Sequence, residues 1–316
     1  MGAPPPYGEI SRLLKRGDVV PFLGAGVNFG MRQPPDAKWK ESGCNFLPSG
    51  RELSLFLADN SGFPSEEEHD LADLAKVASF YVDTMGRERV RERLHELFDR
   101  DFEPCDIHNY LASLPVPILI VTTNYDDLTE RAFKKAGKPY DLVVHPTDRK
   151  DVGASVVWWK AGAEQPEAIA PNRLNIDLKT TNVIYKMHGT VDRQSGAWDS
   201  YVITEEDYID FLTRMTGQTA VPAQFMQYFR KRSFLFMGYG LNDWNLRVVL
   251  NNLKSVLPAE EEGAPAPQAD EDLPSWAIQF RPSDLEKELW STRHVKIYDV
   301  DINEFVRRLR EKGEQQ

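Results

Sequence analysis

Short apolar runs recur along this chain, and each is followed at once by a turn of glycine or polar residues. Residues 18–23 lead into a Gly-Ala-Gly turn, and residues 117–122 lead into a Thr-Asn-Tyr-Asp segment. Apolar runs of this kind, bounded by turn signals, are typical of strands buried on both faces of a parallel sheet. Helical patterns separate the runs, so strand and helix alternate. We therefore expect an α/β fold, a Rossmann-like, doubly wound and mainly parallel sheet.

The apolar patterns also place the individual elements. Strands are expected at residues 18–23, 117–122, 141–144, 155–159, 183–187, 234–237, 276–280 and 295–298, with sheet membership left open for 155–159. Helices are expected within 50–100, at 128–136, 204–215, 221–231, 246–253 and 301–311. We interpret 1–316 as a single domain in which residues 30–114 form a helical lobe, inserted after the first strand and capping a ligand cleft. Residues 258–274, rich in Ala, Pro, Glu and Asp, are expected to form a mobile acidic loop.

Composition argues against several classes of protein. No run of about 18 apolar residues could span a bilayer, and the first residues lack the regions of a secretory signal, so we expect a cytoplasmic protein without membrane contact. The net charge of −11 and the isoelectric point near 5.2 argue against direct nucleic-acid binding, which depends on Lys and Arg. Cys44 and Cys105 are too few for a disulfide framework or a four-cysteine zinc site. We expect both to be reduced, and no metal to be bound.

Four of the expected strands end in segments rich in polar residues and glycine. In an open parallel sheet, ligands bind beyond the carboxyl ends of the strands. The segments at these ends are Gly24-Ala25-Gly26-Val27-Asn28, Thr123-Asn124-Tyr125-Asp126, His188-Gly189-Thr190-Val191-Asp192 and Gly238-Tyr239-Gly240-Leu241-Asn242-Asp243. We therefore expect one ligand site where these four segments meet.

Each segment also has a purely structural interpretation. The first two glycines allow a pyrophosphate to approach backbone N–H groups, but a plain strand-to-loop turn would also favour them, and the third glycine of the dinucleotide fingerprint is missing. Asn124 and Asp126 alternate along an extended segment and should point the same way, although Asp126 could simply cap the next helix. His188 could be a packing residue, but a polar His-Gly pair at a strand exit is awkward for packing alone.

Taken in order, the four strand ends resemble the sirtuin-like family. The matching motifs are the Gly-Ala-Gly turn, the Thr-x-Asn-x-Asp segment, the Lys-x-His-Gly exit and the late Gly-x-x-x-x-Asp turn. The chain is most similar to the bacterial sirtuin-like effector domains of anti-phage defence, which hydrolyse NAD. Residues 47–49, 121–126, 235–239 and 243–247 carry this closer match. The resemblance covers nearly the whole chain.

The resemblance implies NAD as substrate and a role for each candidate residue. His188 would be the catalytic histidine that contacts the ribose hydroxyls, and its near-neutral titration would suit a base. Asn124 would orient the attacking water, and Asp126 would hold the nicotinamide end. The further NAD contacts implied are Gly24, Ala25 and Gly26 at the phosphates, Asn28 and Thr123 nearby, and Gly238, Asn242 and Asp243 beside the adenosine half, where Asp243 could instead cap a helix.

Two departures from the protein deacylases of this family bear on the reaction. Residues 189–238 contain no cysteine, where deacylases carry a four-cysteine zinc module, and Asn28 stands where they usually have serine. Both put acyl-lysine chemistry in doubt, and the resemblance to the defence effector domains implies hydrolysis of NAD to nicotinamide and ADP-ribose, without zinc. The alternatives are a non-catalytic module that senses NAD or a related nucleotide and controls a partner, a lysine deacylase and, more weakly, a dehydrogenase.

Unchecked NAD hydrolysis would harm the host cell, so such an enzyme is expected to be held inactive until something assembles or opens it. The expected controls are homo-oligomerisation and an activating partner, such as a nucleic-acid-sensing ATPase or a sensor domain fused beyond Gln316. No coiled coil or sensor motif in the sequence chooses between them.

Overall fold

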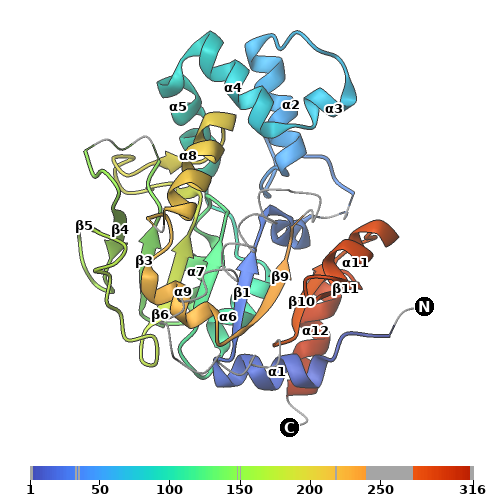
Figure 1. Ribbon diagram of the computed structural model, residues 1–316. Helices are drawn as coiled ribbons and strands as arrows, with labels where there is room; N and C mark the ends of the chain where they lie inside the picture. Colours follow the sequence, from blue (N-terminus) through green and yellow to red (C-terminus); the bar gives the residue numbers. More distant parts are fainter. Residues whose placement is uncertain are drawn as a thin grey trace, which may run out of the picture.

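The computed structural model describes residues 3–32, 34, 36–147, 149, 151–217, 219–239 and 273–313. Through them runs a nine-stranded sheet in the order β11-β10-β9-β1-β2-β6-β3-β4-β5 (Figure 1). The strands are β1 (Val19–Leu23), β2 (Leu119–Thr122), β3 (Tyr140–Val144), β4 (Val156–Trp159), β5 (Glu167–Ile169), β6 (Asn182–Lys186), β9 (Ser233–Met237), β10 (Ser275–Gln279) and β11 (Val295–Asp299). All neighbours are parallel except that β4 runs antiparallel to β3 and β5. The expected mainly parallel α/β sheet is confirmed, and residues 156–159 belong to it.

The central strand β1 lies between β9 and β2, and all five of its side chains are buried. It pairs with β9 along its whole length, from Val19 to Leu23. Its pairing with β2 begins only at Phe22, directly after Pro21, which has no N–H group to donate to a neighbouring strand. Because β1, β2, β6 and β9 all run parallel, their carboxyl ends lie at the same edge of the sheet.

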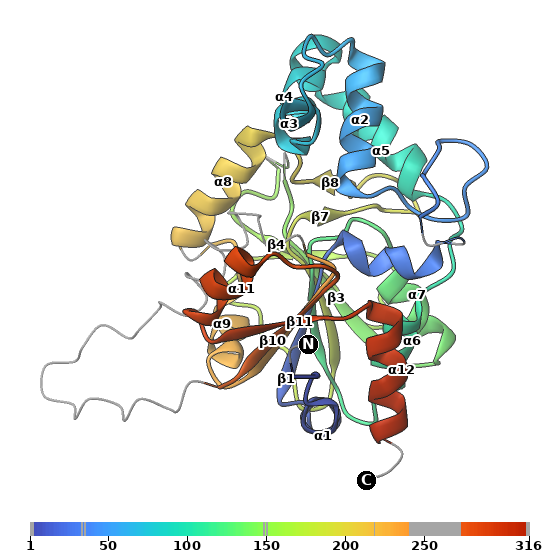
Figure 2. The same cartoon turned by 90° about the vertical axis from the view of Figure 1, so that its right-hand side faces the viewer.

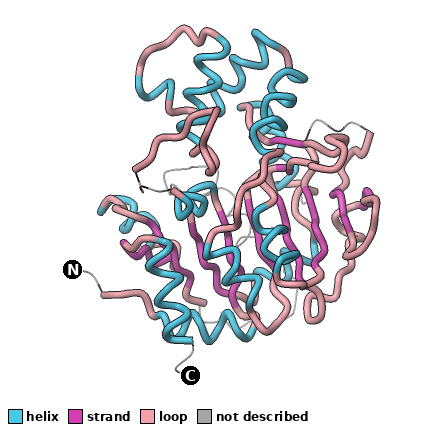
Figure 3. Tube along the Cα trace, turned by 180° about the vertical axis from the view of Figure 1, so that it is seen from behind, coloured by secondary structure: helices cyan, strands magenta, loops and turns pink. Residues whose placement is uncertain are grey.

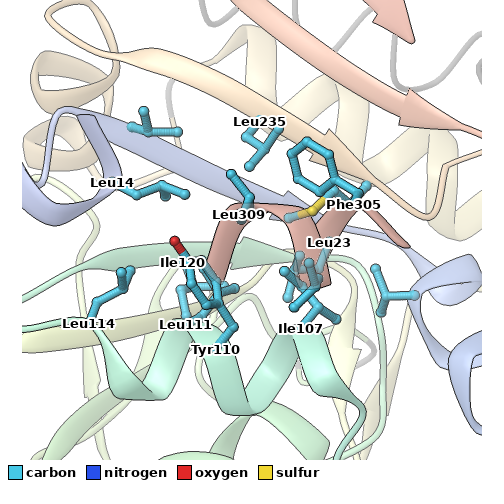
Figure 4. Close-up of a cluster of buried hydrophobic side chains, with 14 of the residues drawn as sticks. Leu14, Leu23, Ile107, Tyr110, Leu111, Leu114, Ile120, Leu235, Phe305 and Leu309 are labelled. Atoms are coloured by element: carbon cyan, nitrogen blue, oxygen red, sulfur yellow. The ribbon is translucent and has the colours of Figure 1, made fainter. Parts of the chain in front are cut away.

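Helices cover one face of the sheet with a continuous apolar layer. They are α1 (Tyr7–Arg16), α6 (Asp106–Ser113), α7 (Leu128–Lys135) and α12 (Ile302–Gly313). Figure 4 shows Leu14, Leu111 and Leu309 of three of these helices close to Ile120 and Leu235 of the strands. Seen from behind, helices lie over the strands on this side (Figure 3). The sequence predictions missed α1.

The opposite face is covered by α8 (Glu205–Thr216), α9 (Ala223–Phe229) and α11 (Asp284–Ser291). Their buried aromatic side chains Phe211, Phe225 and Trp290 pack in one cluster with Phe22 and Phe236 of the central strands. Because both faces carry helices, the sheet is doubly wound, as expected. Only α11 among these three was not predicted.

A second group of helices stands beyond the carboxyl ends of the strands (Figures 1 and 2). The group consists of α2 (Gly50–Ser61), α3 (Glu68–Leu71), α4 (Leu74–Met85) and α5 (Arg87–Phe98), and we call these four helices the cap. The short helix η1 (Ala25–Met31) precedes them in the chain. The cap's own apolar core includes Leu57, Val77 and Leu94 and extends to Tyr125 and Tyr201. A two-stranded sheet of β7 (Gly189–Thr190) and β8 (Ser200–Tyr201) adjoins it.

That residues 30–114 form one lobe inserted after the first strand remains a prediction. Within that range, α6 differs from α2 to α5, because it packs beside α7 and α12 on the face of the sheet.

Some expected features lie outside the described residues. They are Asn242, Asp243, the helix expected at 246–253 and residues 258–272 of the expected mobile loop. Within the described part of the chain, no helix is long and apolar enough to cross a membrane.

Candidate functional site

A cavity of about 360 Å³ lies between the carboxyl ends of the strands and the cap. Ligand sites in proteins usually have volumes of about 300 to 1,000 Å³, so this space suits a small molecule or part of a larger one. From the strand ends it is lined by Ala25, Gly26, Asn28, Thr123, Asn124, Asp126, His188 and Gly238, and from the cap by Leu53, Leu74 and Phe98 among others. The structure thus brings together all the described candidate residues except Gly24, which does not line the cavity.

Two glycines allow the ends of β1 and β9 to touch. A Cβ atom on Gly26 would lie 2.8 Å from the carbonyl oxygen of Gly238, and one on Gly238 would lie 2.3 Å from the backbone nitrogen of Val27. The amide of Gly26 donates to the Gly238 carbonyl, and the amide of Gly24 donates to Met237. These two amides are therefore engaged within the protein, and the phosphate-cradling role expected of this turn remains a prediction.

Asn28 and Asp126 form a buried pair across the cavity floor. The side-chain amide of Asn28 donates to Oδ2 of Asp126 at 3.0 Å. The other carboxylate oxygen of Asp126 accepts a hydrogen bond from the amide of Leu128, the first residue of α7. Asp126 therefore has both roles considered from the sequence: it supports the start of the helix and faces the cavity.

Asn124 is fixed in a similar way. Its backbone amide donates to the hydroxyl of Thr122, and its side-chain amide donates to the carbonyl of Gly24 at 3.3 Å. The amide nitrogens of both Asn28 and Asn124 are thus directed away from a ligand. Their Oδ1 atoms are buried and have no partner within the described structure. Buried polar atoms normally have partners, and both residues line the cavity, so these two oxygens are candidate acceptors for a ligand.

His188 lies at the exit of β6, where its ring packs edge-on against Tyr208 and Phe211 at centroid distances of 5.4 and 5.2 Å. Burial lowers the pKa of His188 to about 3, and the opposing effect of Asp207 is smaller. The expectation of an imidazole that titrates near neutral pH is therefore wrong for this site. At physiological pH the ring is neutral, so one of its nitrogens is an acceptor.

Gly189 explains why glycine follows this histidine. Its φ angle is +91°, and a Cβ atom there would lie 1.9 Å from the carbonyl oxygen of Ser200 on β8. The chain can therefore turn sharply at this point, and the carbonyl of His188 accepts the amide of Val202. This contact fixes the backbone from which the imidazole projects.

Thr123 and Tyr239 connect two of the strand ends. Their hydroxyl groups lie 2.9 Å apart, and the Tyr239 hydroxyl donates to the carbonyl of Leu23. The Tyr239 ring packs against Phe22 at a centroid distance of 5.4 Å. Both residues line the cavity, so this wall is held by β1, β2 and β9 together.

The cap contributes a wall that an ion pair stabilises. Ser49 lines the cavity and caps α2, with Glu52 completing the capping box. The guanidinium of Arg32 binds the Glu52 carboxylate at 2.5 Å, and the amide of Trp39 donates to it. Burial would raise the pKa of Glu52, but the hydrogen bonds from Arg32, Trp39 and Ser49 together lower it to about 2. The segment between η1 and α2 is therefore tied to the first turn of α2.

Sequence reasoning missed the functional potential of Lys186, the last residue of β6. Its side chain is completely buried, and its ammonium contacts Tyr125, Asp126 and Glu130. The Lys-x-His-Gly pattern drew attention to the histidine, while the lysine was only part of the family match.

Asn242 and Asp243, expected beside the adenosine half, lie outside the described residues. Within the described residues, no group of three or more His, Cys, Asp or Glu could hold a metal ion.

Comparison with known proteins identifies the family to which this chain belongs. Residues 118–298, more than half of the chain, match the family model described as a SIR2-like domain. A protein named NAD(+) hydrolase ThsA from Acinetobacter baumannii (strain 532279) is 29% identical over 255 residues, which cover 78% of this chain and 41% of that protein. A protein of the same name from Enterococcus faecium is 27% identical over 253 residues, covering 79% and 42%.

Defense-associated sirtuin 2 from Bacillus subtilis is 21% identical over 304 residues, covering 94% of this chain and 25% of that protein. The chain therefore spans less than half the length of these curated relatives.

Proposed function

This chain belongs to the SIR2-like family, and we propose that its cavity hydrolyses NAD at the bond between nicotinamide and ribose, giving nicotinamide and ADP-ribose. One observation carries the proposal: Asn28, Asn124, Asp126 and His188, from three separate strand ends, face the same cavity. The names of the relatives, NAD(+) hydrolase and defence-associated sirtuin, support it.

The chemistry of NAD fits the groups in the cavity. The nicotinamide ring of NAD is cationic and leaves as a neutral pyridine, so bond cleavage needs no strong acid to protonate the leaving group. The site must instead stabilise an oxocarbenium-like ribose and hold a water near its anomeric carbon. Both tasks call for oriented hydrogen-bond acceptors, which Asn28 and Asn124 provide.

We assign the roles from these acceptors. Oδ1 of Asn124 accepts a hydrogen bond from the attacking water and so orients its lone pair toward the anomeric carbon. The neutral ring of His188 accepts a hydrogen bond from a ribose hydroxyl and so orients the sugar; with its pKa lowered to about 3, it acts by accepting this bond rather than by taking up the proton. Asp126, oriented together with Asn28, holds the nicotinamide end.

The pyrophosphate would lie at the turn of Ala25 and Gly26, and Gly238 would lie on the adenosine side with Asn242 and Asp243. We place the enzyme in the cytoplasm as a regulated effector of anti-phage defence that depletes NAD. Its activity would be controlled by homo-oligomerisation and by an activating partner, either a nucleic-acid-sensing ATPase or a fused sensor domain.

The test is mass spectrometry of the products of NAD, with and without candidate activators. His188→Ala and Asn124→Ala should each release nicotinamide about 10² to 10³-fold more slowly than the parent, because each removes one oriented hydrogen-bonding group, while both remain folded. Matched controls are His69→Ala and Asn60→Ala, at exposed positions in the cap, which should leave the rate unchanged. Undiminished turnover in both site variants would refute the assignment, and NAD binding without any product would favour a sensing module.

A further inference from the structure

A fully buried lysine lies directly beneath the loop that carries Asn124 and Asp126. Among the described residues, Lys186 is the one lysine or arginine that is shielded from solvent. Its partner Glu130, on α7, is also buried, at an Nζ to Oε1 distance of 2.9 Å. Burial raises the pKa of Glu130, and Lys186 opposes that effect. Each of the two charged groups therefore offsets the cost of burying the other.

Lys186 does more than neutralise Glu130. Its ammonium donates to the backbone carbonyls of Tyr125 at 3.0 Å and of Asp126 at 2.5 Å. With Glu130, these carbonyls give all three ammonium protons a partner. The Tyr125 carbonyl also accepts the amide of Val191. The loop is thus held from below by one side chain and from the side by the chain that follows His188.

The same strand end fixes both halves of the site. Lys186 is the last residue of β6, and two residues later the chain presents His188 to the cavity. A shift of the loop relative to β6 would move Asn124 and Asp126 away from His188, and Asn28 with them, because its amide is bonded to Asp126. The ammonium of Lys186 ties the loop to this strand.

Stability alone does not account for a buried ion pair at this place. The cost of removing both charges from water usually offsets their attraction, and apolar residues of similar volume often serve as well or better. We propose that Lys186 is a positioning residue, which fixes the loop of Asn124 and Asp126 in the orientation that His188 requires. This inference rests on the proposed function for its kinetic consequence, whereas its structural consequence can be measured separately.

The test removes the ion pair without leaving a buried charge. In the double variant Lys186→Met with Glu130→Leu, no buried charge is left unpaired, so the protein should still fold, with a somewhat lower melting temperature because the loop carbonyls lose their donor. The rate constant kcat for nicotinamide release should fall by up to about 10²-fold, as expected for a small misplacement of reacting groups, with a smaller change in KM. A matched control is Lys160→Met with Glu167→Leu, an exposed Lys–Glu pair on the β4–β5 edge, which should keep the parent rate.

A second readout does not depend on activity. Hydrogen–deuterium exchange should become faster at the amides of residues 123–128 and at Val191, and remain unchanged on β9 and in α12. The variant Lys186→Gln with Glu130→Leu keeps a side-chain NH2 group that can donate to the loop carbonyls, so it should recover part of the rate and part of the protection. It also replaces the methionine variant if that protein does not fold.

The outcomes separate the two proposals. Parent-like exchange in the loop overturns the positioning role, whatever the rate, and so does a parent-like kcat with loosened exchange. If the parent itself releases no nicotinamide under any condition tried, the proposed function fails, and loop exchange alone then decides the role of Lys186.

Discussion

Three buried histidines predict that the protein loses stability steeply in mild acid. Burial lowers the pKa of His145 and of His188 to about 3, and that of His108 to about 4, from an ordinary value of 6.5. Nearby Arg214 and His188 add to the effect at His145. His145 does not line the cavity and packs edge-on against Phe211, so it can be changed without removing a proposed catalytic group.

The sign follows from which state binds the proton. Above pH 6.5 these histidines are neutral in both the folded and the unfolded chain, and they do not affect stability. As the pH falls below 6.5, the unfolded chain takes up protons that the folded protein excludes until about pH 3 or 4, so the free energy of unfolding decreases. At pH 5 the loss is about 2 kcal/mol for each histidine and about 6 kcal/mol for the three. A typical total stability is about 5 to 15 kcal/mol, so this effect is large enough to measure.

The assay compares the parent with His145→Gln by urea denaturation at pH 7.5 and pH 5, followed by the fluorescence of the seven tryptophans. Glutamine has a similar volume and keeps a polar group near the backbone of Ala220, with which His145 forms a hydrogen bond. Whatever its stability at pH 7.5, the variant should lose about 2 kcal/mol less than the parent on going to pH 5. Equal losses in the two proteins would refute the reasoning, because they would mean that His145 is not neutral in the folded state.

Two further predictions concern the turn and the cap. Gly26→Ala places a methyl group 2.8 Å from the Gly238 carbonyl and should lower the free energy of unfolding by about 1 to 3 kcal/mol; a melting temperature equal to that of the parent would show that the two turns can separate freely. Arg32→Met removes the partner of the Glu52 carboxylate and should cost about 1.5 to 3 kcal/mol, measured by urea denaturation at neutral pH. If the ion pair contributes as described, the added variant Glu52→Gln should change the stability of Arg32→Met less than that of the parent.

The strands were predictable because their signal is local. Every strand with four or more buried or half-buried residues was found, since its apolar run is bounded by turn residues. The strand β5, Glu167–Ile169, was missed because it has three residues, two of them exposed. The helix α1 was missed although Ile10 and Leu14 mark one apolar face and Gly17 ends it in the left-handed conformation. That helix could therefore have been predicted from the sequence.

The convergence of the strand ends was also predictable, but the contacts within the site were not. Topology alone brings Asn124 and His188 to one edge of a parallel sheet. The bond between Asn28 and Asp126 joins residues 98 positions apart, and no periodicity reports such a pairing. The low pKa of His188 arises from burial, to which Tyr208 and Phe211 contribute by packing edge-on against its ring, and this depends on how α8 lies against the sheet. For the same reason, the sequence suggested a near-neutral imidazole where the structure has a strongly depressed pKa.

The polarity of the cavity bears on which reaction of NAD it favours. Asn28 and Asn124 line it and each has a buried acceptor oxygen without a partner in the described structure, Asp126 adds a carboxylate, and His188 is neutral, so these groups together would stabilise positive charge. Hydride transfer to NAD removes the positive charge of the nicotinamide ring, and these groups would stabilise the oxidised ground state more than the transition state. Cleavage of the glycosidic bond moves that charge from the ring to the ribose, where Asn124 and His188 still face it. A catalyst must bind the transition state more tightly than the substrate, so under the proposed function these groups favour hydrolysis over reduction.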